Sequence, residues 1–409
     1  MAEYTHGIYI DEKTTQLPSP IISSVQVVFG TAPVNLAEDI TKVVNKPIIC
    51  KNFEEAKAKL GYSEDFENYT LCQSMYASLN LFKVAPVVFI NVLDPTLHKI
   101  TVAPSNLNIT NKKITVEQEG ILLEGIIVKS SDGTTTYQKT TDYIAGYNDL
   151  GYLVINIIAT GTIPAETTIL KVGFDKLDTT AVTENDIIGG YDSDTGIYTG
   201  IECIEQVYPI HGYVPSIVSA PGWSHNPNIG SILQAKMVNI NGAFKSMCCL
   251  DVDTDDVTTY DAVETWKNTN LYTDKHAILC WPMVKVGEKK IYMSAQLSAL
   301  LAYVDFNNDG VPFVSPSNKD FKISSTILVD GTEVFLDQPK ANYLNGKGIV
   351  TALNMNGWKA WGNNTGAYPE NTDPKDRWIP CRRMFNWQGN NFISIFASKV
   401  DNPTNIRLI

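Results

Sequence analysis

This sequence has few of the features that mark a membrane, secreted or nucleic-acid-binding protein. No run of about eighteen apolar residues occurs, and the N-terminus has neither a basic start nor an apolar core, so we expect no transmembrane segment and no signal peptide. Lys and Arg number 32 against 44 Asp and Glu, and the net charge of −12 argues against a nucleic-acid partner. The default compartment is the cytoplasm, and an acidic surface suits solubility or a basic protein partner.

Motifs for common cofactors are also missing. The sequence contains no G-x-x-x-x-G-K-[ST] and no G-x-G-x-x-G for nucleotides, and its five His form no H-x-x-x-H pair. The seven Cys include no C-x-x-C pair and lie mostly inside apolar runs, which favours buried reduced thiols over a zinc site. We therefore expect no cofactor and no bound metal.

What the sequence does contain predicts an α/β body. Its 409 residues, 44% hydrophobic and 19% charged, are enough for two or three globular domains. Residues 52–61 predict a helix that begins after Asn52 as N-cap and stops at Gly61. Residues 69–82 predict a second amphipathic helix, and the apolar run at 84–95 is typical of a strand buried on both faces of a parallel sheet.

The same alternation of strands and helices returns near residue 200, after a region of different character. Residues 96–196 are short alternating runs, rich in Thr and Ile and broken by Gly, Asp and Asn, which predicts an inserted all-β domain. The predicted fold is thus an α/β body with a largely parallel sheet flanked by helices, plus this insert and an extended N-terminal arm. The expected parts are an arm and tether at 1–20, a first body segment at 21–95, the insert at 96–196, and a second body segment at 197–409.

The arm contains a short strand pattern with no evident partner. In HGIYI, Ile8 and Ile10 project to one face and Tyr9 to the other, and a polar stretch with Pro18 and Pro20 follows. About five added backbone hydrogen bonds at roughly 1 kcal/mol each are offset by about 1 to 2 kcal/mol for each residue ordered. Burial of the three apolar side chains, at roughly 1.5 to 3 kcal/mol each, would tip the balance. Either a later strand of the same chain or the sheet of another molecule, by strand addition, must therefore supply the partner.

One candidate for catalysis is Ser224 with His225. In SAPGWSHNP they fall between a predicted strand and a predicted helix, where an α/β hydrolase places its nucleophile. The second Gly of G-x-S-x-G is missing, and a His next in sequence cannot readily present its ring to the Ser. A helix-capping Ser or Asn is the alternative interpretation.

Two acidic loops are candidates for a metal. DFNNDG at 305–310 matches the first half of a calcium loop, but the twelfth position is Pro316 rather than Glu, so a simple turn is the alternative. DVDTDD, from Asp251 to Asp256, places acidic residues at the spacing of a calcium loop, at the end of a predicted strand. It has Asp256 at the position where the sharp turn of a calcium loop requires Gly. Acidic loops at strand ends are common without any ion.

Several stretches, taken in order, resemble the contractile tail sheath proteins of phages and of phage-derived particles such as R-type pyocins. They are THGIYIDEKTT, VVFGTAPVN, KPIIC, LGYSEDFENYTLCQSMYASLNLF, APVVFINVLDP, DIIGGYDSDTGIYTGIECIEQVY, PSIVSAPGWSHNP, FKSMCCLDVD, WPMVKVG, VPFVSPSNKDF and DNPTNIRLI. They run from about residue 5 to the last residue and leave out only the predicted insert.

The resemblance implies a structural machine part without catalysis. Family members form stacked hexameric rings around a tail tube, and the sheath contracts to drive the tube through a cell envelope. The α/β body faces the tube, inserts decorate the outside, and terminal arms exchange strands between subunits. On that basis the subunit-interface residues are Tyr4, His6, Ile8, Tyr9 and Ile10.

The implied partners are other copies of the chain, the tail tube protein, and the baseplate and tail terminator proteins, with no nucleic acid and no membrane insertion. The implied location is the host bacterial cytoplasm during assembly, and then the virion tail or a released phage-tail-like particle. The resemblance implies that family members continue beyond the DNPTNIRL stretch into a helix and a C-terminal arm. We therefore expect this chain to be a truncated form, with a naturally short variant as the alternative.

Two other hypotheses stay open from the sequence. One is an α/β hydrolase or metal-dependent enzyme that uses Ser224 or the Asp251 to Asp256 loop. The other is a non-contractile surface or adhesion protein whose β-rich insert binds a ligand. The absence of a complete catalytic motif argues against the first, and the length of matched sequence outside the insert argues against the second.

Overall fold

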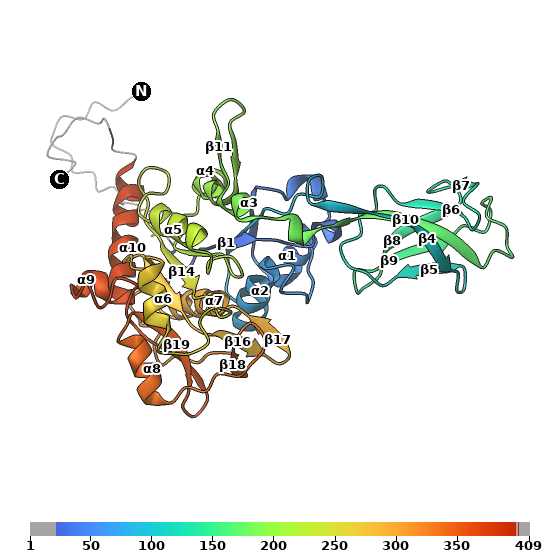
Figure 1. Ribbon diagram of the computed structural model, residues 1–409. Coiled ribbons are helices and arrows are strands. Elements are labelled where there is room, and N and C mark those ends of the chain that lie inside the picture. The colour runs from blue at the N-terminus through green and yellow to red at the C-terminus, as the bar shows by residue number, and fades with distance from the viewer. Residues whose placement is uncertain (1–21, 398–399, 401–409) are drawn as a thin grey trace, which may run out of the picture.

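The structure is a computed structural model that describes residues 22–397 and residue 400. An α/β body carries a long β-rich projection on one side, and helix α10 (Ile379–Phe396) lies at the opposite side of the body (Figure 1). Among the described residues, no helix combines the length and the apolar character needed to cross a membrane.

The body is built on one eight-stranded sheet. In spatial order its strands are β2 (Pro47–Cys50), β3 (Val87–Asn91), β1 (Gln26–Gly30), β13 (Ile217–Ser219), β14 (Met247–Asp251), β15 (Ala277–Cys280), β19 (Ile349–Asn354) and β20 (Trp358–Trp361). The six inner strands are parallel, and only the edge strands β2 and β20 run antiparallel to their neighbours. This arrangement confirms the predicted fold class of a largely parallel sheet in an α/β body, with separate antiparallel sheets outside it.

Five of the six inner strands are buried along their whole length. Every residue of β1, β3, β13, β14 and β15 is buried, as expected for parallel strands covered on both faces. The register pairs Val27 of β1 with Val88 of β3 on one side and with Val218 of β13 on the other. β-branched side chains therefore stack across the centre of the sheet, where they pack well.

The first predicted helix is present with its predicted cap. Helix α1 (Phe53–Leu60) begins after Asn52, whose side chain accepts a hydrogen bond from the Glu55 backbone amide. Gly61 ends it with φ 76°, a left-handed conformation that glycine adopts without a Cβ penalty. The next predicted helix is a short α-helix, α2 (Leu71–Ser74), continued by the π-helix η3 (Met75–Phe82). The spacing of apolar residues predicted a helix here, but it did not predict that the second half would be a π-helix.

The other helices of the body follow the predicted alternation up to residue 306. The α-helices are α3 (Glu184–Ile188), α4 (Val207–His211), α5 (Pro227–Lys236), α6 (Val263–Thr269), α7 (Met293–Phe306), α8 (Gln338–Asn345), α9 (Pro374–Arg377) and α10. Short 3-10 helices are η1 (Val34–Leu36), η2 (Ile40–Lys42), η4 (Thr179–Ala181) and η5 (Gly200–Gln206). Helix α7 is buried almost throughout, packs on η3, and contacts β13, β14 and β15.

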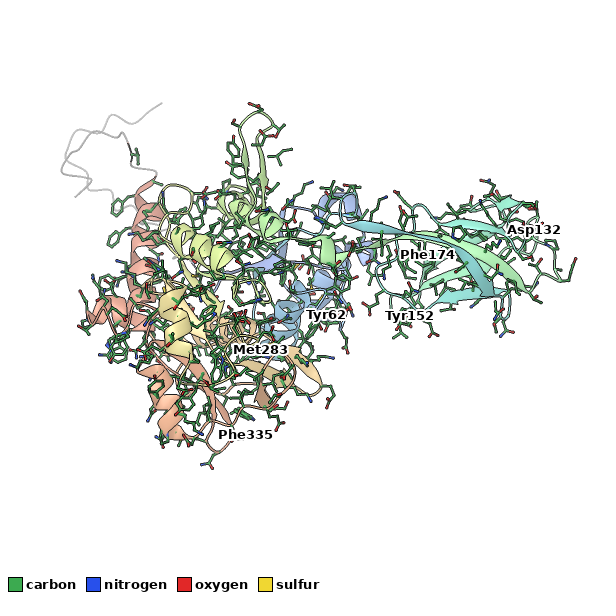
Figure 2. All side chains as sticks on the ribbon, in the orientation of Figure 1. Tyr62, Asp132, Tyr152, Phe174, Met283 and Phe335 are labelled. Carbon is green, nitrogen blue, oxygen red and sulfur yellow. The ribbon has the colours of Figure 1, made fainter. Side chains whose placement is uncertain are left out.

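The projection has its own strands and its own core. One sheet orders β4 (Lys99–Asn108), β10 (Ile169–Leu177), β6 (Ile127–Ser130) and β7 (Thr136–Tyr137), and the other orders β5 (Lys113–Val116), β9 (Leu153–Ile157) and β8 (Tyr143–Tyr147). Apolar side chains of both sheets, Phe174 among them, form a cluster separate from that of the body (Figure 2). The chain enters and leaves at one place, where the Asp178 amide donates to the His98 carbonyl at 2.9 Å.

Two small β units complete the body. Strand β16 (Met283–Val286) pairs with β17 (Lys289–Ile291) and β18 (Ser325–Ile327). Strands β11 (Gly190–Asp192) and β12 (Ile197–Thr199) form a two-stranded hairpin that stands out from the body beyond α3 and α4 (Figure 1).

Candidate functional site

The Ser224 hydroxyl lies inside the protein and not on an exposed turn. Its residue is fully buried, and its Oγ donates to Asp251 Oδ2 at 3.1 Å and accepts from the Asp251 amide at 3.0 Å. The ring of His225 instead stacks on Tyr292, with the two planes at 2°. The structure therefore does not assemble Ser224 and His225 as a nucleophile and its base.

Asp251 uses its carboxylate to hold a helix. It accepts from the Ser294 amide at 2.9 Å and from the Ser294 hydroxyl at 2.5 Å, at the start of α7. A carboxylate at a helix N-terminus satisfies free backbone N–H groups and is favoured by the helix dipole. Burial raises the pKa of Asp251 from 3.8 to about 6, and the bonds from Ser294 and Ser224 oppose that rise. Asp251 thus joins β14 to α7.

The first residue of the candidate calcium loop at 305–310 has a similar structural role. Asp305 belongs to α7, is fully buried, and binds the guanidinium of Arg383 with Nη1 to Oδ1 at 2.9 Å and Nη2 to Oδ2 at 2.5 Å. Its carboxylate cannot be an open ligand while it neutralises Arg383. Across the described part of the chain, no three His, Cys, Asp or Glu side chains converge as a metal ligand set.

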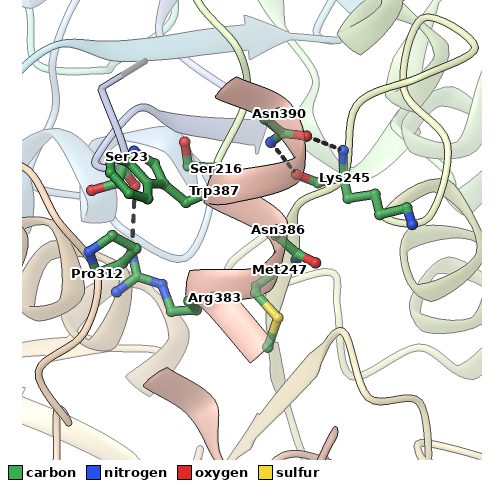
Figure 3. A pocket seen from close by; sticks show the side chains of 9 residues that line it. All are labelled: Ser23, Ser216, Lys245, Met247, Pro312, Arg383, Asn386, Trp387 and Asn390. Atoms are coloured by element: carbon green, nitrogen blue, oxygen red, sulfur yellow. Dashed lines mark hydrogen bonds between the residues drawn. The ribbon is translucent and has the colours of Figure 1, made fainter. Parts of the chain in front are cut away.

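The Asp305 and Arg383 pair belongs to a larger polar cluster that joins β1 to α10. Ser23, three residues before β1, donates from its hydroxyl to Asp305 Oδ2 at 3.1 Å, and its carbonyl accepts from Arg383 Nη2 at 3.3 Å (Figure 3). Farther along α10, Asn390 exchanges two hydrogen bonds with the Lys245 backbone, at 2.8 and 2.9 Å (Figure 3). A cavity of about 20 Å³, room for one water, lies among these side chains. We call this cluster the terminal junction, because the described chain begins at residue 22 beside it and α10 is the last described helix.

Helix α10 has its polar side inward and an aromatic side outward. Arg382, Arg383, Asn386 and Asn390 are buried against the body. Phe385, Phe392 and Phe396 are 50%, 63% and 49% exposed, and the last two rings stack at 6.1 Å. Their spacing of seven and four residues places them on one helical stripe. A soluble monomer rarely leaves such a stripe uncovered, so this face is suited to contact another chain.

Sequence reasoning missed the terminal junction. The residues after 374 fall in the predicted second body segment, but no helix is predicted there, whereas α10 runs for 18 residues. The available signals for α10 were Pro380 as an early helical residue and the aromatic spacing 385, 392 and 396. The inward residues are Arg and Asn, so the usual apolar period does not mark the buried face. The predicted arm residues Tyr4, His6, Ile8, Tyr9 and Ile10 lie outside the described residues.

Comparison with known proteins links this chain to tail sheaths. No protein-family model matches it. The tail sheath protein of Burkholderia phage BcepMu is 28% identical over 380 residues, which cover 90% of this chain and 76% of that protein.

Solved structures share the fold at low sequence identity. The sheath tail protein of Desulfitobacterium hafniense matches with a TM-score of 0.52 at 10% identity, over 97% of this chain and 85% of that one. The sheath complex of an extracellular contractile injection system, in the contracted state, matches with a TM-score of 0.51 at 13% identity, over 99% of this chain and 77% of that one.

Proposed function

Because this chain belongs to the contractile tail sheath protein family and is a tail sheath subunit of a contractile injection system, we propose that it assembles as stacked hexameric rings around a tail tube and contracts to drive the tube through a cell envelope. It is a structural component of a phage tail or a phage-tail-like particle, and not an enzyme. The single observation that carries the proposal is the match to a phage tail sheath protein along 90% of the chain.

The proposed partners are other copies of the chain, the tail tube protein, and the baseplate and terminator proteins. Self-assembly is supported by the fold shared with a subunit of a solved sheath complex. Assembly in the host cytoplasm, followed by residence in a virion tail or a released particle, belongs to the same proposal.

The proposed links between subunits are the N-terminal arms. In this proposal Tyr4, His6, Ile8, Tyr9 and Ile10 add a strand to a neighbouring subunit's sheet. The terminal junction supports this role, because a pull on the arm would meet Ser23, which the buried Arg383 and Asp305 hold at the base of β1. Strand β1 lies in the middle of the sheet, so the load would pass into the most buried part of the body.

Negative-stain electron microscopy of the full-length chain tests the proposal. The purified protein is examined over a series of salt concentrations, alone and with the cognate tube. We expect long hollow or tube-wrapped helical polymers. Monodisperse monomers of the intact chain under every condition would refute assembly as a sheath.

A further inference from the structure

The β11 and β12 hairpin projects from the body with its side chains in solvent. It contains only three cross-strand pairs, Gly190 with Thr199, Tyr191 with Tyr198, and Asp192 with Ile197. All residues from 191 to 197 are exposed, including Tyr191 at 54% and Ile197 at 55%. The hairpin stands clear of the rest of the body (Figure 2). A two-stranded hairpin of this length gains little stability from its own contacts in water. We therefore expect its exposed apolar side chains to be covered by another surface.

The hairpin is nevertheless held firmly at its base. Gly189 and Gly200 have φ of 63° and 55°, and a Cβ on Gly189 would lie 2.0 Å from the Thr199 carbonyl oxygen. The Gly200 amide donates to Asn45 Oδ1 at 2.9 Å, beside edge strand β2. Such close backbone packing fixes the direction of the hairpin relative to the sheet. The hairpin is therefore a rigid projection at the β2 edge and not a loose loop.

The tip of the hairpin is acidic and aromatic. The rings of Tyr191 and Tyr198 pack at a tilt of 37° with centroids 4.5 Å apart, and the turn carries Asp192 and Asp194. Asp192 accepts from the Asp194 amide and the Thr195 hydroxyl within the turn, whereas the Asp194 carboxylate has no partner among the described residues. The sequence has no Lys or Arg from residue 177 to 235, so no basic side chain within that stretch neutralises the tip.

A surface of matching chemistry lies where η3 meets the end of α7. Lys322 Nζ donates to the Leu81 carbonyl at 2.5 Å and lies 4.7 Å from the Phe82 ring centroid and 5.6 Å from that of Tyr303. Tyr303 is 39% exposed, and Phe306, one turn farther along α7, is 69% exposed. Lys83 follows Phe82 and is also exposed, with no side-chain partner within the described part of the chain. We call these residues, Lys83, Lys322, Tyr303 and Phe306, the basic aromatic patch.

The two surfaces are carried by different elements of one rigid body. The hairpin packs on α3 and η5, whereas the patch is formed by the end of η3, the end of α7 and Lys322. The hairpin stands away from α7 (Figure 1). Complementary surfaces held apart on one body cannot meet within it, and between copies they make a head-to-tail contact that propagates.

We propose that the β11 and β12 hairpin docks on the basic aromatic patch of a second copy of this chain. Tyr191 and Tyr198, a cross-strand pair on one face of the hairpin, pack against Tyr303 and Phe306 of the second copy. The Asp194 carboxylate pairs with Lys83 or Lys322. Such a contact repeats from copy to copy in an open helical array. The inference rests on the proposed function, because it assumes that the chain meets other copies of itself, and it adds a contact made by the folded body instead of the arms.

Cysteine crosslinking in the full-length chain tests the contact. One preparation carries Asp194→Cys and another Lys322→Cys, and a short bismaleimide is added to each alone and to their mixture. Native thiols give little background, because six of the seven Cys are buried and Cys381 is half-buried. We expect crosslinked dimers in the mixture, at least fivefold above either preparation alone. Leu150→Cys, 69% exposed in the projection, is the matched control and should give no dimers with Lys322→Cys.

A charge exchange tests the chemistry of the same contact. Asp194→Lys should raise the protein concentration needed for polymers about tenfold, because like charges then face each other. Adding Lys83→Glu and Lys322→Glu to that variant should bring the concentration needed for polymers most of the way back to that of the parent. Asp149→Lys makes the same charge change on an exposed residue of the projection and should leave that concentration unchanged.

The outcomes separate this inference from the proposed function. Polymers without the mixed crosslink would overturn the contact and leave the sheath proposal standing. Mixed crosslinks without polymers would keep the contact and overturn the sheath. Equal crosslinking within the Asp194→Cys preparation alone would mean that two hairpins meet each other, which contradicts docking on the patch.

Discussion

At the scale of single residues, buried charges join segments that are far apart in the sequence. Arg383 is 3% exposed and Asp305 is fully buried, and their pair connects α10 to α7 beside Ser23. Removing one partner of such a pair leaves an unpaired charge in a poorly solvated site. The terminal junction therefore depends on both residues together.

Replacing Arg383 alone tests this dependence. Arg383→Met should lower the free energy of unfolding by about 3 to 5 kcal/mol. The double variant Arg383→Met with Asp305→Leu should recover much of that loss, because no buried charge remains. Urea unfolding of both variants and the parent measures the difference. Equal losses in the single and double variants would mean that the ion pair is not what holds the junction.

Asp251 makes a prediction about pH. Burial raises its pKa in the folded state from 3.8 to about 6, so the folded protein holds this proton more tightly than the unfolded chain. The stability contributed by that proton is complete below about pH 4 and is lost as the pH rises through about 6. Relative to Asp251→Asn, which does not titrate at this position, the parent should lose about 2 kcal/mol between pH 4 and pH 7. Urea unfolding of both proteins at these two pH values measures it, and a pH-independent difference would contradict the account.

At the scale of elements, glycines with positive φ fix where the hairpin leaves the body. A Cβ on Gly200 would meet the Ile187 carbonyl oxygen at 2.4 Å, whereas Gly196 in the turn has a similar φ of 72° and open space around it. Both positions carry the left-handed backbone penalty of roughly 1 to 2 kcal/mol for alanine. Gly200→Ala should cost on the order of 1 to 3 kcal/mol more than Gly196→Ala, because of the added clash. Thermal unfolding of the two variants tests this, and equal melting temperatures would rule out a tightly packed base.

The sequence allowed most body elements to be predicted, where local signals and packing agree. Asn52 and Gly61 bound α1 as expected, and the apolar run at 84–95 contains β3. The edge strands β2 and β20 run antiparallel, which no residue pattern specifies, because direction depends on the connections between elements. Arg383 and Asp305 are 78 residues apart, and a contact at that separation has no periodic signature. The enzyme hypotheses failed for a related reason, since burial of Ser224 and Asp251 is set by tertiary packing.

At the scale of the whole molecule, the β-rich projection is attached so that the body need not depend on it. Most of its buried apolar side chains form a cluster separate from that of the body, and only Leu122 and Leu177 join the body's cluster. Its two connections lie side by side at His98 and Asp178. Replacing residues 100–176 by a short Gly-Ser linker should leave a body that unfolds cooperatively. Its m-value should be smaller than that of the parent, because less surface becomes exposed on unfolding. A variant without a cooperative transition would show that the projection is part of the body's folding unit.

The central claim is that this chain is a sheath subunit whose N-terminal arm links it to its neighbours. Deletion of residues 1–15 separates the arm from the folded body, and the deleted and full-length proteins can be compared at the same concentration. Electron microscopy of the two, with thermal unfolding of each as a check of the fold, is the most direct measurement. The account predicts polymers for the full-length chain, none for the deletion variant, and nearly equal unfolding temperatures. Polymers of the deletion variant, or a large fall in its unfolding temperature, would contradict the claim.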